Sequence, residues 1–333
     1  MKKILAKAII AGVAMVGCFG IVALCSEKNR ETKQLMLEDK DLVRDSEKPV
    51  EEVGQELVTG LTEIQELGNL PPMTEGKENE QTESAKTWKL HYVDAWGEWH
   101  DAVIDPTVST HGYEWNCLTR NGQDIIYLDQ TYHSRKGVDV SHHQGEINWE
   151  KVKAAGYDFA ILRIAYRGYG ESGNLMEDKK FFEYYEGARA AGLDVGVYLF
   201  SQAVNEQEAF EEAQFVLKLL DGKELQLPVT YDPETIRDDV ARTDAVSGEQ
   251  FTKNAILFCD EIEKAGYEPM IYSNMVWEDE FFDMKLLEKY TFWYADYEPV
   301  PQTPYQFAYW QYSEKGSVDG IEGAVDLDIQ FIE

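Results

Sequence analysis

The chain has 333 residues and a formal net charge of −31, with 44% hydrophobic and 12% aromatic residues. This length accommodates one barrel-sized domain together with additional segments. The strong negative charge would repel phosphate backbones, so we expect no nucleic-acid binding.

The first 25 residues have the pattern of an export signal. Lys2, Lys3 and Lys7 precede an uncharged apolar run of 18 residues at 8–25. A basic start with an apolar run is typical of a signal peptide, and this run is also just long enough to span a bilayer. Two interpretations remain open: a retained membrane anchor, which we favour, or cleavage, with lipid attachment at Cys18 as one variant. In either case the lysines stay inside and the rest of the chain lies outside the membrane.

Residues 26–86 read as an acidic, disordered linker. Residues 26–85 contain 16 Asp and Glu against 7 Lys and Arg, and no aromatic residue. A segment without apolar bulk cannot offset the conformational entropy that is lost on ordering. We interpret it as a spacer.

Residues 87–134 predict a small β-rich extension. The composition changes abruptly at Trp88, and apolar residues then alternate with polar ones as in strands. An Asn121-Gly122 turn signal precedes a second apolar run at 124–128. Its tryptophans could contact sugars, but we expect them mainly to pack against the next domain.

Residues 135–333 alternate between strand and helix patterns. We predict strands at 137–141, 159–165, 194–200, 227–232, 269–273, 291–295, 307–312 and 324–331, and helices at 149–155, 177–191, 206–220 and 247–265. Gly192 and Gly266 are the expected helix stops. This order predicts an α/β fold with parallel strands, an irregular TIM-like (β/α) barrel of eight strands that lacks helices in its last third. A flat doubly wound sheet is the competing fold, and no GxGxxG turn supports it.

The four cysteines do not suggest a disulfide framework. Cys18 and Cys25 lie in the N-terminal apolar run, and Cys117 and Cys259 are far apart in the sequence. Nothing in their spacing predicts a zinc site. A Cys117–Cys259 bridge is one possibility, but we favour two separate thiols.

Acidic residues fall at the predicted ends of three strands. Asp139 ends the first strand, Asp232 and Glu234 end the fourth, and Asp326 and Asp328 lie on the last. Functional side chains of α/β barrels project from the carboxyl ends of their strands. These acids are therefore the candidate site.

Asp232 and Glu234 have a spacing that matters for chemistry. Residues two apart in an extended segment point to the same side, so both carboxylates should face one mouth. Because two adjacent carboxylates cannot both ionise freely, one pKa is expected to rise. A protonated acid beside a charged partner is what glycoside hydrolysis requires. A DxE pair alone would more often be two solvated acids, and the strand-end position favours function.

Seven short motifs make the region resemble a known family. They are GVDVSHHQG at 137–145 with INW at 147–149, GVYLF at 196–200, LPVTYDPE at 227–234, IYS at 271–273, FWYA at 292–295, WQY at 310–312 and GIEGAVD at 320–326. Because these motifs occur in this order, the chain resembles glycoside hydrolase family 25, the lysozymes or N-acetylmuramidases of bacterial, phage and fungal origin. The resemblance covers residues 137–332 and implies a lysozyme with an irregular eight-stranded barrel. Together with the N-terminal pattern, it leads us to expect an exported or membrane-anchored bacterial enzyme.

The resemblance also implies roles for the four acids. Glu234 would be the general acid and base, and Asp232 would stabilise a positively charged oxazolinium formed by the substrate's own acetamido group, with retention. Asp139 and Asp326 would hold the hydrogen-bond network of the site. By the same resemblance, we expect sugar contacts from residues near strand ends, where core packing is an equal alternative: Tyr198, Tyr272, Trp293, Trp310 and Gln311.

Two features depart from the family pattern. The residue between the two acids is Pro233, where an apolar or aromatic residue is usual. Proline lacks an N–H, but at a strand end that loss is small, so we expect activity to survive. The segment at 163–168, which begins with Arg163, also differs and could alter the glycan subsites.

The expected activity is cleavage of the β-1,4 bond between N-acetylmuramic acid and N-acetylglucosamine in peptidoglycan. We expect no cofactor and no metal, since the adjacent His142 and His143 make a poor ligand pair. We expect a monomer on the outer face of a bacterial membrane or secreted, where a tether would keep an acidic enzyme near an anionic wall. Two alternatives remain: a non-catalytic glycan-binding module of the cell surface, and a hydrolase of the same fold that acts on chitin-like polymers.

Overall fold

The computed structural model describes residues 88–333. The predicted signal or anchor at 1–25 and the predicted linker at 26–86 lie outside the described residues, as does Cys18. Among the helices of residues 88–333, none combines the length and the apolar character that crossing a bilayer requires.

Eight strands form a closed barrel. They are β5 (His133–Val140), β6 (Phe159–Arg167), β8 (Asp194–Ser201), β9 (Val229–Pro233), β10 (Pro269–Ser273), β11 (Thr291–Ala295), β12 (Tyr309–Gly316) and β13 (Val325–Ile332). They are hydrogen-bonded in the order β5-β13-β12-β11-β10-β9-β8-β6, and the β5–β6 pair closes the ring. This confirms the predicted TIM-like barrel and excludes the flat sheet. One departure is that β13 runs antiparallel to both β12 and β5.

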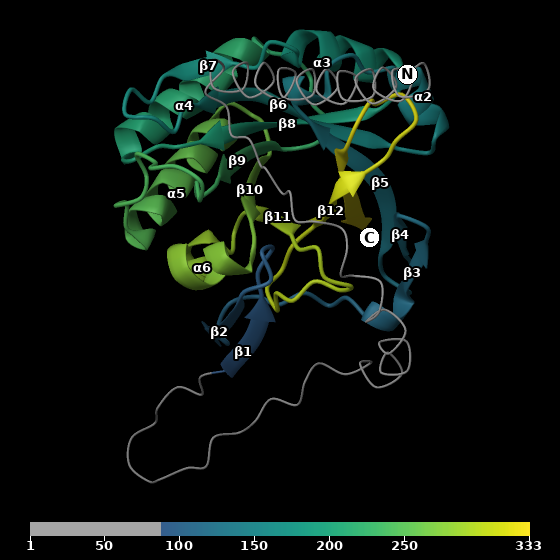
Figure 1. The fold of residues 1–333 in the computed structure, drawn as a ribbon. Helices are drawn as coiled ribbons and strands as arrows, with labels where there is room; N and C mark the ends of the chain where they lie inside the picture. Colours follow the sequence, from purple (N-terminus) through teal and green to yellow (C-terminus); the bar gives the residue numbers. More distant parts are fainter. Residues whose placement is uncertain (1–87) are drawn as a thin grey trace, which may run out of the picture. The chain divides into compact units, whose positions relative to one another are not determined.

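Helices cover the first part of the barrel and become sparse in its last third, as predicted. They are α2 (Trp149–Ala154), α3 (Phe181–Ala190), α4 (Glu206–Leu220), α5 (Gly248–Lys264), a π-helical turn η4 (Trp277–Phe281) and the short α6 (Met284–Leu287). Figure 1 shows α3, α4 and α5 around one side of the strands. The chain passes from β11 to β12 and from β12 to β13 through loops.

Capping residues explain where the two longest helices begin and end. Asn205 accepts a hydrogen bond from the N–H of Glu208 before α4, and Ser247 accepts one from the N–H of Gln250 before α5. Each cap satisfies an N–H that lacks a partner within the helix. Gly266 follows α5 with a φ of 89°, a left-handed conformation that glycine adopts without strain.

The predicted helix at 177–191 begins four residues too early. Residues Leu175–Glu177 form a short strand, β7, that pairs antiparallel with β6, and α3 starts at Phe181. The buried carboxylate of Asp178 lies between them, where it accepts a hydrogen bond from Arg163 Nε. Local periodicity does not reveal this contact with a residue of another strand.

The N-terminal extension consists of two hairpins, β1–β2 (Trp88–Val93 and Trp99–Ile104) and β3–β4 (Leu118–Asn121 and Asp124–Tyr127). A turn of 3-10 helix, η2 (Trp115–Cys117), precedes β3. Both hairpins lie away from α3 and α4 in Figure 1. Tyr113 anchors the extension: its ring stacks on Phe331 with the centroids 4.0 Å apart, and its hydroxyl donates to the carbonyl of Phe307 at 2.6 Å.

Two apolar clusters lie on the two sides of the barrel wall. The inner cluster fills the barrel and includes Phe159, Ile161, Met270, Trp293 and Tyr309. The outer cluster packs the strands against the helices and the extension. The strand β6 is buried at all nine positions because both of its faces are covered. Cys117 and Cys259 are separate free thiols, as favoured from the sequence.

Candidate active site

The carboxyl end of β9 carries the predicted acid pair. Asp232 is buried, with 3% of its surface exposed, and Glu234 follows β9 with a half-buried side chain. Pro233 is the last residue of β9, where a missing N–H removes little from the sheet. The backbone of Glu234 is fixed by the buried Gln202, whose Nε2 donates to the Glu234 carbonyl at 2.7 Å.

The other two predicted acids face each other across the β5–β13 pair. Asp139 and Asp326 are direct register partners, and Asp328 lies opposite Gly137. Side chains two apart on a strand share a face, so all three carboxyls point to the same side of the sheet. Asp139 and Asp328 are buried, whereas Asp326 is partly exposed. The closure of the barrel therefore creates this acidic pair from the two ends of the domain.

Gln311 positions the carboxylate of Asp139. Its side-chain amide donates to Asp139 Oδ2 at 2.8 Å. Its Oε1 accepts hydrogen bonds from the hydroxyls of Tyr272 at 3.0 Å and Tyr297 at 2.9 Å. With the oxygen occupied by two phenols, the NH2 group must face Asp139. Gln311 and Tyr272 are 3% exposed, so both act behind the site rather than as open contact surfaces.

Trp293 supports the layer of side chains beneath these acids. Its indole Nε1 donates to Asp328 Oδ1 at 2.9 Å, and its ring meets Tyr272 and Tyr198 edge to face, with the centroids 4.9 and 6.0 Å apart. Burial raises the pKa of Asp328 well above its ordinary value.

Tyr198 connects the two groups of acids. It lies on β8, is half-buried, and interacts electrostatically with both Asp139 and Asp232. Burial and these two negative charges raise the pKa of its phenol well above the usual range, so the hydroxyl stays protonated. A protonated phenol near these carboxylates can donate a hydrogen bond to a substrate.

An ion cluster that the sequence did not predict lies beside Tyr198. Arg163 Nε donates to Asp178 Oδ2 at 2.9 Å, and His142 Nδ1 lies 2.9 Å from the same oxygen. Although burial opposes ionisation, the bond with His142 and the charge of Arg163 lower the pKa of Asp178 to about 2. Arg163 was noticed only as a departure from the family pattern. Asp178 had no local signal, because its importance depends on a contact with a residue of another strand.

Trp310 does not belong to this group. It is fully buried in the outer cluster, between the sheet and the extension, with its ring centroid 6.4 Å from Trp115 and 5.8 Å from Tyr312. Its Nε1 donates to the carbonyl of Asp296 at 2.7 Å. Adjacent residues of a strand point to opposite sides, so Gln311 faces inward and Trp310 outward. The expected sugar contact by Trp310 is therefore corrected to a packing role.

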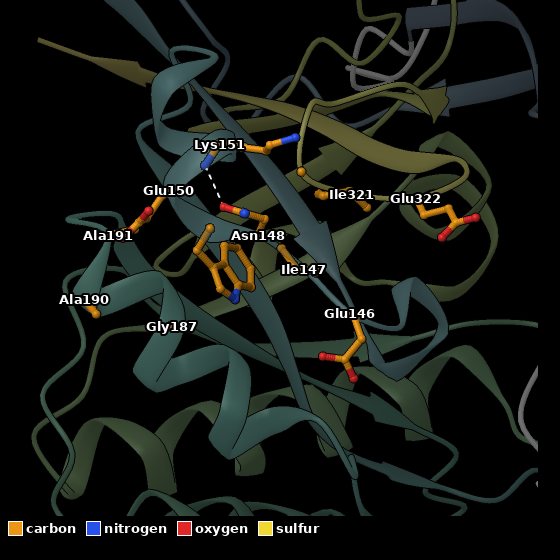
Figure 2. Close-up of a pocket in the computed structure, with 12 residues that line it drawn as sticks. Glu146, Ile147, Asn148, Glu150, Lys151, Gly187, Ala190, Ala191, Ile321 and Glu322 are labelled. Carbon is orange, nitrogen blue, oxygen red and sulfur yellow. Dashed lines mark hydrogen bonds between the residues drawn. The ribbon is translucent and has the colours of Figure 1, made fainter.

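A separate groove of about 700 Å³ lies on the flank of the barrel. Figure 2 shows Asn148, Lys151, Gly187 and Ile321 around it, from α2, α3 and the loop before β13. None of the four predicted acids lines it. The candidate site therefore rests on the convergence of strand ends and not on this groove.

Comparison with known proteins identifies the family of this barrel. The model of glycosyl hydrolases family 25 matches residues 138–321, more than half of the chain. The autolytic lysozyme of Clostridium acetobutylicum is 25% identical over 194 residues, which cover 58% of this chain and 55% of that protein. Lysozyme M1 of Streptomyces globisporus is 27% identical over 200 residues, which cover 57% and 66% of the two chains. The chain thus spans little more than half of the first of these relatives.

Two solved structures share the fold. The modular autolysin LytC of Streptococcus pneumoniae superposes with a TM-score of 0.52 at 23% identity, over 75% of this chain and 57% of that one. A family 25 glycosyl hydrolase of Bacillus anthracis gives a TM-score of 0.50 at 21% identity, over 63% of this chain and 94% of that one. At these identities the structures establish the barrel architecture. The family match, which covers more than half of the chain and includes Asp139, Asp232 and Glu234, shows that the chain belongs to glycosyl hydrolases family 25.

Proposed function

We propose that this protein is a peptidoglycan hydrolase, a muramidase that cleaves the β-1,4 bond between N-acetylmuramic acid and N-acetylglucosamine. The observation that carries the proposal is that Asp232 and Glu234, at the carboxyl end of β9, lie at the same mouth of a family 25 barrel as Asp139 and Asp326 on the β5–β13 pair. One related structure, LytC, is described in complex with a synthetic peptidoglycan ligand, which supports this class of substrate.

The proposed reaction gives Glu234 and Asp232 different tasks. Glu234 donates its proton to the glycosidic oxygen as the bond breaks, while the acetamido oxygen of the N-acetylmuramic acid attacks the anomeric carbon. Asp232 stabilises the positive charge that develops on the resulting oxazolinium. Glu234 then removes a proton from a water molecule, and this water attacks the anomeric carbon and opens the oxazolinium ring. The configuration at the anomeric carbon is retained overall. The partial exposure of Glu234 and the burial of Asp232 suit these tasks, because the acid must reach the leaving group and the stabiliser acts best away from water.

The surrounding residues hold this arrangement in place. Gln311 orients Asp139, and Tyr272 and Tyr297 fix Gln311 in turn. Tyr198 is the best placed of the predicted contact residues to meet a sugar, since it is half-buried and lies near Asp139 and Asp232.

The proposal also places the enzyme outside the cell. The basic start and the apolar run at 8–25 are the support for export, with an anchor favoured over release. An enzyme with a net charge of −31 would be repelled by an anionic wall, and a tether would offset that repulsion by raising the local concentration.

The test is product analysis of purified peptidoglycan digested by the full chain. We expect mass spectrometry to find fragments with N-acetylmuramic acid at the reducing end. Glu234→Gln should lower the rate by about 10²-fold to 10⁴-fold, the usual contribution of a general acid. Glu150→Gln, an exposed position on α2, is the control of equal charge change and should retain full activity.

Three results would contradict the proposal. Full activity in Glu234→Gln would remove the assigned acid. Binding of glycan without turnover would favour the surface-binding module instead. Hydrolysis of chitin oligomers, with peptidoglycan left intact in a parallel assay, would favour the chitin-like substrate.

A further inference from the structure

The β1–β2 hairpin of the extension touches three loops at the barrel mouth. Its Tyr92 hydroxyl donates to Asp279 at 3.4 Å on the turn after β10. The N–H of Val93 donates to Gln302 Oε1, and Gln302 Nε2 donates to the carbonyl of Val93, both at 2.9 Å. Gln302 lies in the loop after β11. The turn of the hairpin contacts Arg237 in the loop after β9. All three loops follow the carboxyl ends of parallel strands, the face on which Asp232 and Glu234 lie.

Figure 1 shows the same arrangement, with β1 and β2 beside the segment around α6 and the loops beyond β10 and β11. The hairpin therefore borders the mouth of the barrel on the side of the loops after β9, β10 and β11. Arg237 follows Glu234 by three residues, so the two Cα atoms can be at most about 10 Å apart. That separation is within the span of a few sugar rings.

The turn that joins β1 to β2 is held rigidly by Asp94. Its carboxylate, almost completely buried, accepts hydrogen bonds from the N–H groups of Trp96 and Glu98, both at 2.9 Å. Gly97 completes the turn with a φ of 82° and donates its N–H to the carbonyl of Asp94 at 3.0 Å. The position of Trp96 is consequently set before any ligand arrives, which lowers the entropic cost of binding to it.

Arg237 fixes the indole of Trp96 from the barrel side. Its guanidinium carbon lies 3.6 Å from the ring centroid, and its NH2 group is 3.2 Å from Asp94 Oδ2 and 3.7 Å from Glu98 Oε2. This cation–π stack covers part of the ring and leaves 42% of Trp96 exposed. Asp94, Glu98 and His100 offer atoms within 4.8 Å of one another that could hold a metal ion, but the positive charge found among these acids is Arg237.

A second exposed tryptophan of the hairpin has different surroundings. Trp99 is 64% exposed and stacks on His91, with centroids 4.6 Å apart. Tyr92 and Ala102 point inward and are buried, whereas His91 and Trp99 lie on the outward face of the hairpin. Trp99 thus shares the residue type and the exposure of Trp96, but it does not share its contact with the loop after β9.

We propose that Trp96, backed by Arg237, is an additional subsite that stacks an N-acetylhexosamine ring of the same glycan strand beyond the cleavage site. The inference rests on the proposed function and extends it, because the hairpin precedes the matched region at 138–321. The occupant is a glycan strand because the platform is an exposed aromatic ring at the mouth that carries the carboxylates. Sugar rings present apolar C–H faces that pack on such rings.

The experiment compares long glycan strands with the shortest fragment that the wild type still cleaves, using the full chain. We expect Trp96→Ala to lower kcat/KM about tenfold on long strands, mainly through KM, and less than twofold on the short fragment, which does not reach the subsite. Trp96→Phe should recover most of the loss. Trp99→Ala is the matched control and should behave as the wild type on both substrates.

Two outcomes would overturn the proposal. An equal loss on long and short substrates would mean that Trp96 only holds the loop after β9, and unchanged kinetics on long strands would mean that it contacts no sugar. The proposed function is judged separately from wild-type turnover. If the wild type cleaves nothing, calorimetric binding of long strands to the wild type and Trp96→Ala still decides the subsite: about tenfold weaker binding supports it and equal binding rejects it.

Discussion

Glu278 allows a quantitative test of the loops at the mouth. It lies on η4 after β10, is 6% exposed, and accepts hydrogen bonds from Ser273 Oγ at 2.9 Å and from Thr303 Oγ1 at 2.5 Å. Thr303 belongs to the loop after β11 that also holds the β1–β2 hairpin. Burial raises the pKa of Glu278 from 4.5 to about 8, against the opposing effect of the two hydroxyls.

The sign and size of the effect on stability follow from this pKa. Below pH 4.5 the carboxyl is protonated in both the folded and the unfolded chain, so it costs nothing. Between pH 4.5 and about 8 the unfolded chain ionises while the folded protein keeps the proton. The free energy of unfolding therefore falls by about 1.4 kcal/mol per pH unit from this group. From pH 5 to pH 7 the loss amounts to about 2–3 kcal/mol.

Glu278→Gln removes this titration and keeps the shape of the side chain. Chemical denaturation at pH 5 and pH 7 should show that the variant gains about 2–3 kcal/mol relative to the wild type over this interval. Glu280→Gln, an exposed position on the same turn, is the control and should show no such gain. If the difference between Glu278→Gln and the wild type is the same at both pH values, the buried, neutral state of Glu278 is refuted.

Two further predictions concern side chains around the site. Asp178→Asn should destabilise the protein by at least about 2 kcal/mol at neutral pH, because a pKa lowered to about 2 stabilises the fold above pH 4 and Arg163 would lose its buried partner. Denaturation curves of the two proteins should converge as the pH falls through 2, and a gap independent of pH would contradict the ion cluster. Trp310→Phe should lower the free energy of unfolding by about 1–3 kcal/mol through its lost bond to Asp296, while KM for glycan stays unchanged. A raised KM would mean that Trp310 does contact the sugar, contrary to its assigned packing role.

The sequence determined much of the barrel and the identity of its acids. Alternating strand and helix patterns are local, and strand ends can be read from them, which is why Asp139, Asp232, Glu234 and Asp326 could be selected. The helix stop at Gly266 was also predictable, since a left-handed residue after a helix is a property of the residue itself.

The tertiary structure decided which side chains face one another. The antiparallel direction of β13 and its register against β5 place Asp326 opposite Asp139, and Asp328 one layer deeper, and neither follows from local pattern. The same register turns Gln311 inward and Trp310 outward, although both lie in one motif. The carboxylate of Asp178, just after β7, is bound by Arg163 of another strand, a contact that no local pattern predicts.

The hairpin is the clearest case of this division. Its β-rich character was predicted from the sequence, but its place at the mouth depends on partners such as Gln302, 209 positions from Val93 in the chain. Periodicity reports which face of an element is apolar, because that is set by neighbouring residues. It does not report what covers that face, because closing the barrel and docking the hairpin are set by packing between distant segments. For this protein, that packing is what places the four acids at one mouth of the barrel and Trp96 beside the loop that follows Glu234.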